Sequence, residues 1–172
     1  MIGIRKIFTY MLFLTLASCN CGKPDNTGGR SKEGLVVTHT PLNISEVPKE
    51  LIEKLHFPYV RFYRTEVSNK TNVPIRIIWF DWYFTQNGNW TASNVRNKVL
   101  KNADFLDWHT RDDISKDGWL RPGGKATCLV NWHWTESPED IQSKWAYLGV
   151  DANGNDYFAE ATVPAIKPEK LK

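Results

Sequence analysis

The chain has 172 residues, which fits one ordinary domain together with short targeting or linking segments. Its apolar fraction of 41% and charged fraction of 24% are typical of a globular protein and exclude a largely disordered or polytopic membrane chain. The net charge of +3 is small and scattered, without a basic stripe interleaved with aromatic residues, so we expect no nucleic-acid partner.

The N-terminus has the three parts of a secretory signal. Arg5 and Lys6 form the positive start, residues 7–16 form an apolar stretch, and residues 17–18 are small. The apolar stretch of about ten residues is half the length needed to span a bilayer. We therefore predict a cleaved signal over residues 1–18.

Residues 16–19 read Leu-Ala-Ser-Cys and resemble the lipobox of bacterial lipoproteins, in which cleavage falls before the cysteine. The resemblance implies that Cys19 becomes the acylated first residue of the mature protein, a modification that anchors a chain to a membrane. Asn20 follows in place of aspartate, which by the sorting habit of enterobacterial lipoproteins implies the outer membrane, with the protein facing the periplasm or the cell surface. The alternative is an ordinary signal peptide with a chance cysteine.

Residues 19–34 carry glycines, a proline and charges but no residue suited to a core, which predicts a flexible tether. The remaining cysteines, Cys21 and Cys128, are able to pair in an oxidising compartment. The unpaired form is favoured, because Cys21 lies on the tether and Cys128 occupies a core-facing position of a predicted strand.

The folded domain is predicted over residues 35–164, followed by a polar tail over residues 165–172. Its first strand is predicted over residues 34–40. Residues 45–56 indicate a short helix with Pro48 in its first turn.

A second strand is predicted over residues 59–67. There Val60 and Phe62 alternate with Arg61, so we expect the face that carries Arg61 to be the wetter one.

Residues 73–86 form the most informative predicted strand, because both of its faces are apolar. One face carries Ile78, Phe80, Trp82 and Phe84, and the other carries Ile75, Ile77, Trp79 and Tyr83. This pattern indicates a central strand that is covered on both sides. Asp81 lies on the second face and needs an arginine or backbone donors at a sheet edge, unless it is a binding-site acid.

The remaining elements complete a mainly β domain. Residues 93–108 predict a helical insertion capped by Ser93, residues 124–134 predict a strand, and residues 137–140 predict a helix start. Residues 145–163 predict a hairpin around Asn153-Gly154. We therefore predict a small antiparallel β-sandwich, immunoglobulin-like, with short helical insertions.

The spacing of reactive residues argues against an enzyme. Cys128 and His133 differ by an odd number, so a regular strand would point them to opposite faces and prevent a dyad. No nucleophile elbow, phosphate-binding glycine loop or histidine pair at metal spacing is present in the sequence. We therefore predict no catalytic residues and no cofactor, although an active site assembled from distant residues remains open.

Residues 104–113 gather oxygen donors and one histidine that are suited to a cation: Asp104, Asp107, His109, Asp112 and Asp113. Arg111 competes for these carboxylates, so a solvated loop after a helix is the favoured interpretation and no metal site is predicted.

The tryptophans fall into two groups. Those on predicted strands are expected in the core: Trp79, Trp82, Trp132 and Trp134. Trp90, Trp108 and Trp119 lie in connections, where exposed aromatic residues often form a recognition surface for proteins or for sugar rings. The alternative is that these three cap the ends of the sandwich.

Residues 69–88, which read NKTNVPIRIIWFDWYFTQNG, resemble small enterobacterial outer-membrane lipoproteins of the YcfL-like family. The shared pattern is an asparagine, a proline before β-branched residues, and a tryptophan- and tyrosine-rich strand that ends in glycine. This sequence departs from the family pattern in two ways. Asp81 falls earlier than the family's acidic residue, whose position is taken by Thr85, and residues 92–117 form an insertion that the family pattern lacks. The resemblance implies a sandwich fold and no activity.

The segments NADFLDW, LRPGG and WAYLGV are similar in order and spacing to the sandwich lipoprotein of type VI secretion membrane complexes. That likeness implies a scaffold role through a protein partner in the envelope. The sequence thus favours a lipid-anchored interaction or scaffold module without catalytic activity. The alternatives are a saccharide- or peptidoglycan-binding domain that uses loop tryptophans, and a metal-dependent envelope enzyme centred on His109.

Overall fold

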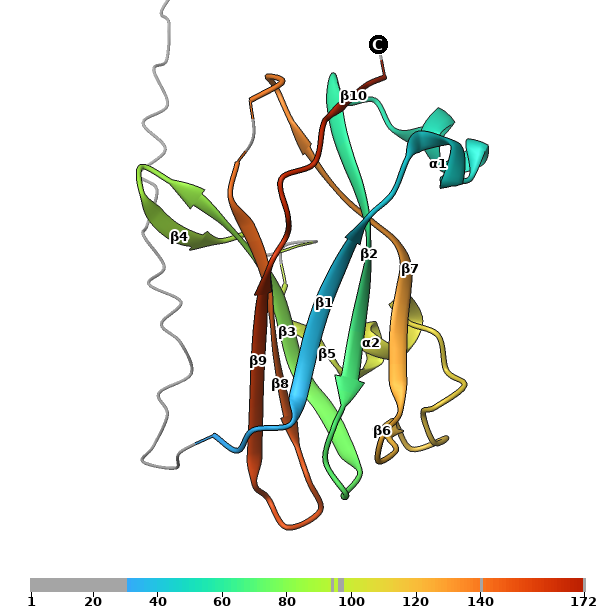
Figure 1. Ribbon diagram of the computed structural model, residues 1–172, viewed down its shortest axis with the longest axis vertical. Coiled ribbons are helices and arrows are strands. Elements are labelled where there is room, and N and C mark those ends of the chain that lie inside the picture. Colours follow the sequence, from blue (N-terminus) through green and yellow to red (C-terminus); the bar gives the residue numbers. More distant parts are fainter. Residues whose placement is uncertain (1–30, 94, 96–97, 140, 172) are drawn as a thin grey trace, which may run out of the picture.

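The computed structural model describes residues 31–93, 95, 98–139 and 141–171, and its strands form two antiparallel sheets packed face to face (Figure 1). The predicted fold class, a small and mainly β sandwich with few helices, is confirmed. The predicted signal peptide, Cys19, Cys21 and most of the predicted tether lie outside the described residues.

The first sheet is built around β2 (Tyr59–Asn69), which pairs with three other strands. These are β1 (Leu35–Pro41), β7 (Lys125–Thr135) and the short β10 (Glu169–Lys170).

The second sheet is built around β3 (Ile75–Gln86), which pairs with β8 on one side and with three short strands on the other. The strands added to β3 are β4 (Asn89–Ala92), β5 (Leu100–Lys101), β6 (Trp119–Leu120), β8 (Ser143–Val150) and, beyond β8, β9 (Asp156–Thr162). The β8–β9 pair confirms the predicted hairpin around Asn153-Gly154.

Helices are short. The turn η1 (Ile44–Glu46) and α1 (Lys49–Lys54) cover the outer face of the first sheet, which confirms the helix predicted there in a shorter form. The helix predicted over residues 93–108 is confirmed only in its second half, as α2 (Asn102–Trp108), and residues 137–139 form bends rather than a helix. Within the described part of the chain, no helix is both long and apolar enough to cross a bilayer.

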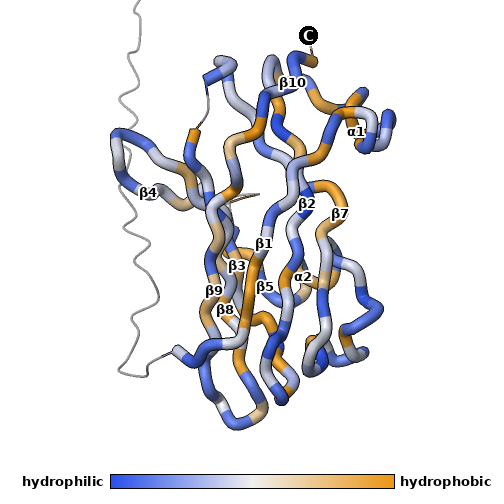
Figure 2. Tube along the Cα trace, in the orientation of Figure 1, coloured by the Kyte–Doolittle hydropathy of each residue, from blue (hydrophilic) through white to orange (hydrophobic). Residues whose placement is uncertain are grey.

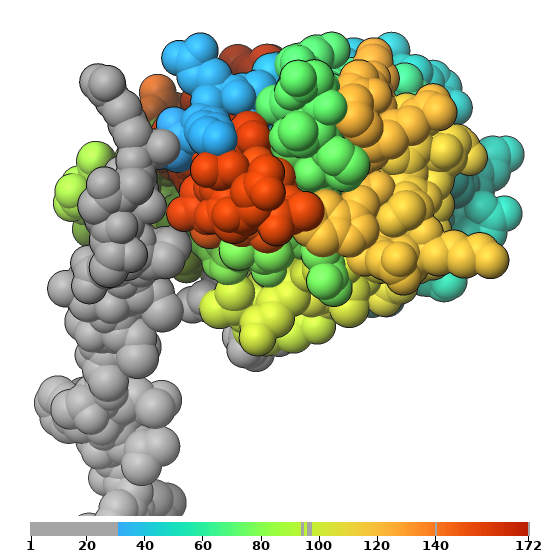
Figure 3. All heavy atoms as spheres, turned by 90° about the horizontal axis from the view of Figure 1, so that it is seen from below, coloured from blue at the N-terminus to red at the C-terminus, as the bar shows by residue number. Residues whose placement is uncertain are grey.

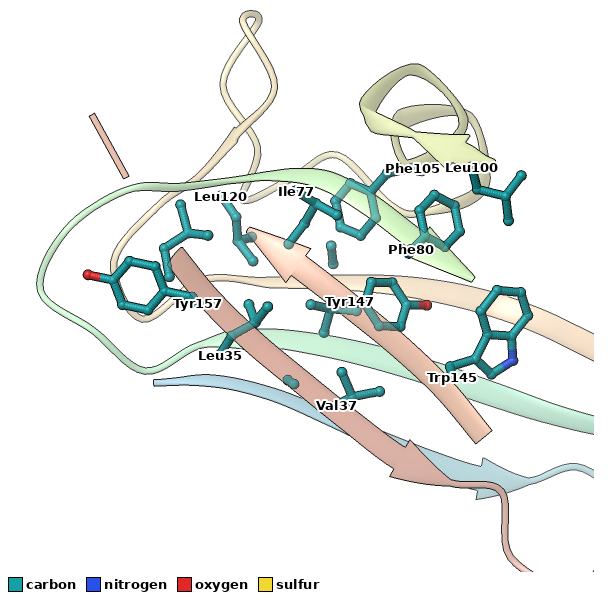
Figure 4. Close-up of a cluster of buried hydrophobic side chains, with 14 of the residues drawn as sticks. Leu35, Val37, Ile77, Phe80, Leu100, Phe105, Leu120, Trp145, Tyr147 and Tyr157 are labelled. Atoms are coloured by element: carbon teal, nitrogen blue, oxygen red, sulfur yellow. The ribbon is translucent and has the colours of Figure 1, made fainter. Parts of the chain in front are cut away.

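The main core lies between the two sheets (Figure 4). Phe80 of β3 stacks on Tyr147 of β8 with ring centroids 5.3 Å apart and contacts Phe105 of α2 edge to face at 6.0 Å. Hydrophilic residues gather in the β3–β4 and β8–β9 turns (Figure 2). Such burial of aromatic rings is the main stabilising contribution in a domain of this size.

A one-residue bulge in β3 changes the predicted faces of this strand. The register pairs Ile77 with Gly149 and Trp79 with Leu148, so Ile78 has no counterpart in β8. Beyond the bulge the side-chain alternation is inverted, and Ile75 and Ile77 therefore share the inner face with Phe80. The predicted assignment of these residues to opposite faces is wrong.

Arg61 is fully buried on the inner face of β2, so the prediction of a wetter face there is also wrong. Its guanidinium donates to Ile166 O at 3.0 Å, Thr135 Oγ1 at 2.8 Å, Pro138 O at 3.0 Å and Glu139 O at 2.7 Å. These hydrogen bonds allow a charged side chain to remain inside, because at least four of the five N–H groups that leave water meet an oxygen of the protein.

Residues 165–171, predicted as a polar tail, continue the fold. Ile166 is buried in the main core, and β10 adds to the start of β2. Leu171 packs on the cluster beneath α1, and its N–H donates to Pro58 O at 3.2 Å. The described domain therefore extends past residue 164.

Candidate functional site

An aromatic cleft of about 830 Å³ opens between β3 and β7, the strands at which the two sheets diverge. Its walls come from β3, β7, β8, α2 and the connections after β4 and β7. Five of the eight tryptophans of the chain line it: Trp82, Trp108, Trp132, Trp134 and Trp145. The other lining residues are Phe84, Ser93, Val95, Cys128, Val130, Asn131, His133 and Ile141.

A second bulge, in β7, shapes the cleft. The register pairs Tyr63 with Asn131 and Thr65 with Cys128, so residues 129 and 130 together oppose Arg64. The extra residue inverts the alternation of β7. The strand therefore points Ala126 and Cys128 inward before the bulge, and Asn131 and His133 inward after it.

Cys128 and His133 consequently line the same cleft, at 8% and 4% exposure, and the prediction that they point to opposite faces is wrong. Burial raises the pKa of the Cys128 thiol to about 11. Burial, with a smaller contribution from the charge of Arg61, lowers the pKa of His133 to about 4. Both groups are therefore neutral at pH 7, whereas a catalytic thiolate needs the opposite shift.

Aromatic rings are arranged in order along the cleft. The imidazole of His133 stacks on Trp82 with centroids 5.6 Å apart and planes 26° apart, and Trp82 stacks on Phe84 at 5.5 Å. Deeper in, Trp108 meets Trp145 edge to face at 6.2 Å. These contacts hold the rings in fixed orientations, and the stack of His133 on Trp82 joins β7 to β3 within the cleft lining.

Several polar atoms of the cleft are buried without a hydrogen-bond partner among the described residues. They are the indole N–H of Trp82, the hydroxyl of Ser93 and both ring nitrogens of His133. Buried polar groups in folded proteins nearly always find a partner, so unpaired groups that converge on one cavity indicate a place for a ligand.

Asn131, by contrast, is engaged within the protein. Its side-chain oxygen accepts the Trp132 N–H at 2.9 Å, and its amide nitrogen donates to Thr65 Oγ1 at 3.3 Å. The imidazole, the indole N–H and the hydroxyl are thus the buried polar groups of the lining residues that lack a partner among the described residues.

Asp81 stands outside the cleft lining and has a structural partner. Its carboxylate accepts the backbone N–H of Trp82 at 2.8 Å, at the point of β3 that lies between the residues paired with β4 and those paired with β5. The predicted pairing with a backbone donor is therefore confirmed, but β3 has neighbouring strands on both sides and is not a sheet edge. Burial raises the pKa of Asp81 to about 6, an effect that the hydrogen bond partly offsets.

The three tryptophans predicted in connections lie instead in β4, α2 and β6, and they do not share a surface. Trp90 is 42% exposed with the ammonium of Lys144 4.6 Å from its ring centre, Trp108 lines the aromatic cleft, and Trp119 lines a smaller pocket of about 320 Å³. Trp90 pairs with Thr85 and Trp119 with Arg76, which puts them about 30 Å apart along β3. They provide no common platform for a sugar.

The strand tryptophans are less buried than predicted. Trp134 is 42% exposed, and its ring lies parallel to that of Phe57 with centroids 4.7 Å apart. Trp79, Trp82 and Trp132 are half-buried.

The acidic segment does not converge on a metal. His109 is buried and donates from Nδ1 to Phe105 O at 3.0 Å, Asp104 pairs with Lys98, and Asp113 pairs with Arg121. Over the described ranges, no group of three or more His, Cys, Asp or Glu side chains is placed to hold a metal ion.

Sequence reasoning missed most of the cleft. His133 and Ser93 carry its unpaired polar atoms, and Phe84 and Trp145 form part of its walls, yet none of the four was a candidate. The signal that was missed is the bulge after Cys128, which turns His133 inward.

No family model matches this chain, and no curated protein matches it. Two solved structures align with it over most of its length. A crystal structure assigned to ApaA from Bordetella pertussis is 17% identical, covering 78% of this chain and 96% of that one, with a TM-score of 0.45. The X-ray structure of Northeast Structural Genomics Consortium target SoR45 is 13% identical, covering 80% of this chain and 83% of that one, with a TM-score of 0.43.

Proposed function

We propose that this chain is a non-enzymatic, lipid-anchored interaction module of the bacterial cell envelope that binds its partner in the aromatic cleft. The observation that carries the proposal is the cleft itself, whose aromatic walls enclose unpaired polar atoms at a side chain as buried as His133. Its size is that of a typical ligand site.

Two features support binding rather than catalysis. The raised pKa of Cys128 keeps the thiol protonated, and the lowered pKa of His133 leaves an imidazole that is a weak base at neutral pH. In addition, none of the residues that line the cleft carries a charge at neutral pH.

The lipobox-like residues 16–19 support attachment of the mature chain through Cys19, in the outer membrane and facing the periplasm. The described chain starts at the end of the sandwich formed by the β2–β3 and β8–β9 turns (Figure 3), where Lys32 N donates to Asp156 O at 2.8 Å. Phe84 in the cleft lies about 25 Å farther along β3 than Arg76, the residue level with Asp156. The described chain therefore begins at the end of the sandwich remote from the cleft.

The anchor is tested by growing cells with an alkyne analogue of palmitate and labelling the purified protein. We expect Cys19→Ala to abolish the label and the matched variant Cys21→Ala to keep it. Label that survives Cys19→Ala contradicts the proposed attachment.

The partner site is tested by photo-crosslinking in cells. A benzophenone amino acid replaces Trp134 at the cleft, and in a matched variant it replaces Phe158 on β9, where exposure is nearly the same, 41% against 42%. We expect a discrete adduct from position 134 that is absent from position 158 and weakened by Cys19→Ala. Adducts of equal yield from both positions, or none from position 134, would contradict binding at the cleft.

A further inference from the structure

We infer that the aromatic cleft takes an uncharged, amphipathic small ligand: a flat apolar body with a neutral group that both donates and accepts hydrogen bonds. This inference rests on the proposed function, because it names the ligand class for the same site.

The polar end of the ligand follows from the unpaired atoms. The Trp82 indole N–H only donates, and it requires an acceptor. The neutral imidazole of His133 offers one donor and one acceptor, and the Ser93 hydroxyl offers both. A hydroxyl, phenol or amide group satisfies this set, whereas a group that only accepts leaves the bare imidazole nitrogen unpaired.

The lack of charged residues in the cleft lining indicates that the ligand is uncharged. The lining residues include no carboxylate, ammonium or guanidinium, so an ion that enters loses water without gaining an opposite charge. Arg61 pairs with His133 in the β2–β7 register, but its guanidinium is not part of the lining and donates to Thr135 and to three backbone carbonyls.

The flat apolar body follows from the ring geometry. Trp82 and Phe84 of β3 form a stacked run with His133 of β7, and Trp108 and Trp145 also line the cleft. Planar rings are recognised by such offset stacking, and the volume of about 830 Å³ is that of a small-molecule site.

The test uses two probes that share one ring system. 2-Naphthol is neutral at pH 7 and carries one hydroxyl, and naphthalene-2-sulfonate is its anionic counterpart. Each is titrated into the full chain carrying Cys19→Ala, which removes attached acyl chains as competing ligands, and the tryptophan indole N–H signals are followed by ¹H–¹⁵N NMR.

We expect 2-naphthol to shift the Trp82 signal, assigned with Trp82→Phe, and to bind at least tenfold tighter than the sulfonate. The signals of Trp79, Trp90 and Trp119 serve as internal controls, because these residues do not line the cleft. Equal or tighter binding of the sulfonate, or no shift of the Trp82 signal with 2-naphthol, overturns the inference.

Variants test the polar end. His133→Phe retains a ring against Trp82 but removes both nitrogens, and we expect it to weaken 2-naphthol binding at least tenfold, while Trp90→Phe leaves it unchanged. If His133→Phe does not fold, Ser93→Ala tests the same end, with an expected loss of at least threefold. Unchanged affinity in the folded variant contradicts the assignment of polar contacts.

The two proposals fail in different ways. A protein adduct from position 134 together with no response to 2-naphthol leaves the interaction module standing and overturns the ligand class. Selective binding of 2-naphthol without any adduct in cells supports the ligand class and contradicts the proposed envelope partner.

Discussion

Replacing Arg61 by methionine tests whether the buried guanidinium holds β2 together with the end of β7, the connection after it and the C-terminal segment. Arg61 donates to residues 135, 138, 139 and 166 from a side chain with no exposed surface. Hydrogen bonds to charged groups contribute about 1.5–3 kcal/mol each, and the methionine variant loses all of those made by Arg61. The variant also avoids the free-energy cost of moving a guanidinium out of water, and we expect this to offset several kcal/mol of the loss. A net loss of about 3 kcal/mol in the free energy of unfolding follows.

Urea unfolding measures this loss. With a denaturant slope of about 2 kcal/mol per M for a domain of this size, the midpoint falls by about 1.5 M. Arg64→Met is the matched control, because Arg64 is an exposed neighbour on the same strand, and we expect a change within about 0.5 kcal/mol. If the two variants are equally stable, the hydrogen bonds of Arg61 do not contribute as argued.

Three histidines have pKa values lowered to about 4, chiefly by burial: the half-buried His39 and the buried His109 and His133. Between pH 6.5 and 4 the unfolded chain therefore binds more protons than the native one, and stability falls as the pH drops, by up to about 3 kcal/mol for each of the two buried rings. Asp81 has the opposite effect, because its raised pKa lets the native protein bind one proton that the unfolded chain does not, but one carboxyl does not cancel three histidines. Urea midpoints that stay constant over this pH range would refute the lowered histidine pKa values. Tyr63→Phe removes the acceptor of a buried indole N–H donated at 2.9 Å, which we expect to cost about 1–3 kcal/mol by urea unfolding; a loss below about 0.5 kcal/mol contradicts it. Because burial raises the pKa of Cys128 to about 11, iodoacetamide should label this thiol at least a hundredfold more slowly in the native protein than in urea, and equal peptide-level rates would disprove its protection.

The strands could be predicted from the sequence because their signals are local. Alternating apolar residues predicted β1, β2, β3 and β7, and Asn153-Gly154 predicted the β8–β9 turn, so the sandwich itself followed.

The errors have a common physical origin in long-range structure. Arg61 reads as a solvent-facing residue until the carbonyls of residues 138, 139 and 166 are brought to it by distant parts of the chain. Leu100 is fully buried and pairs with Phe80, a tertiary contact that replaces the helical spacing read from residues 93–108. Local patterns carry no information about such partners.

The candidate site was missed for a related reason. A bulge leaves almost no trace in composition, because it depends on how many residues oppose each other across two strands. His133 therefore read as an outward residue of β7, although the pairing of Tyr63 with Asn131 fixes it inward.

The extra residue of β7 has a consequence for how this chain tolerates insertions and deletions. Removing one residue at position 129 or 130 would leave the composition almost unchanged, yet it would restore regular alternation across the whole strand. Asn131 and His133 would still point inward, because the alternation that is inward at Ala126 and Cys128 reaches them directly once a single residue opposes Arg64. The inward face of β7 therefore tolerates the loss of one residue at the bulge as well as replacement of Leu129, whose side chain is mostly exposed, whereas a deletion between Asn131 and His133 would turn the imidazole outward.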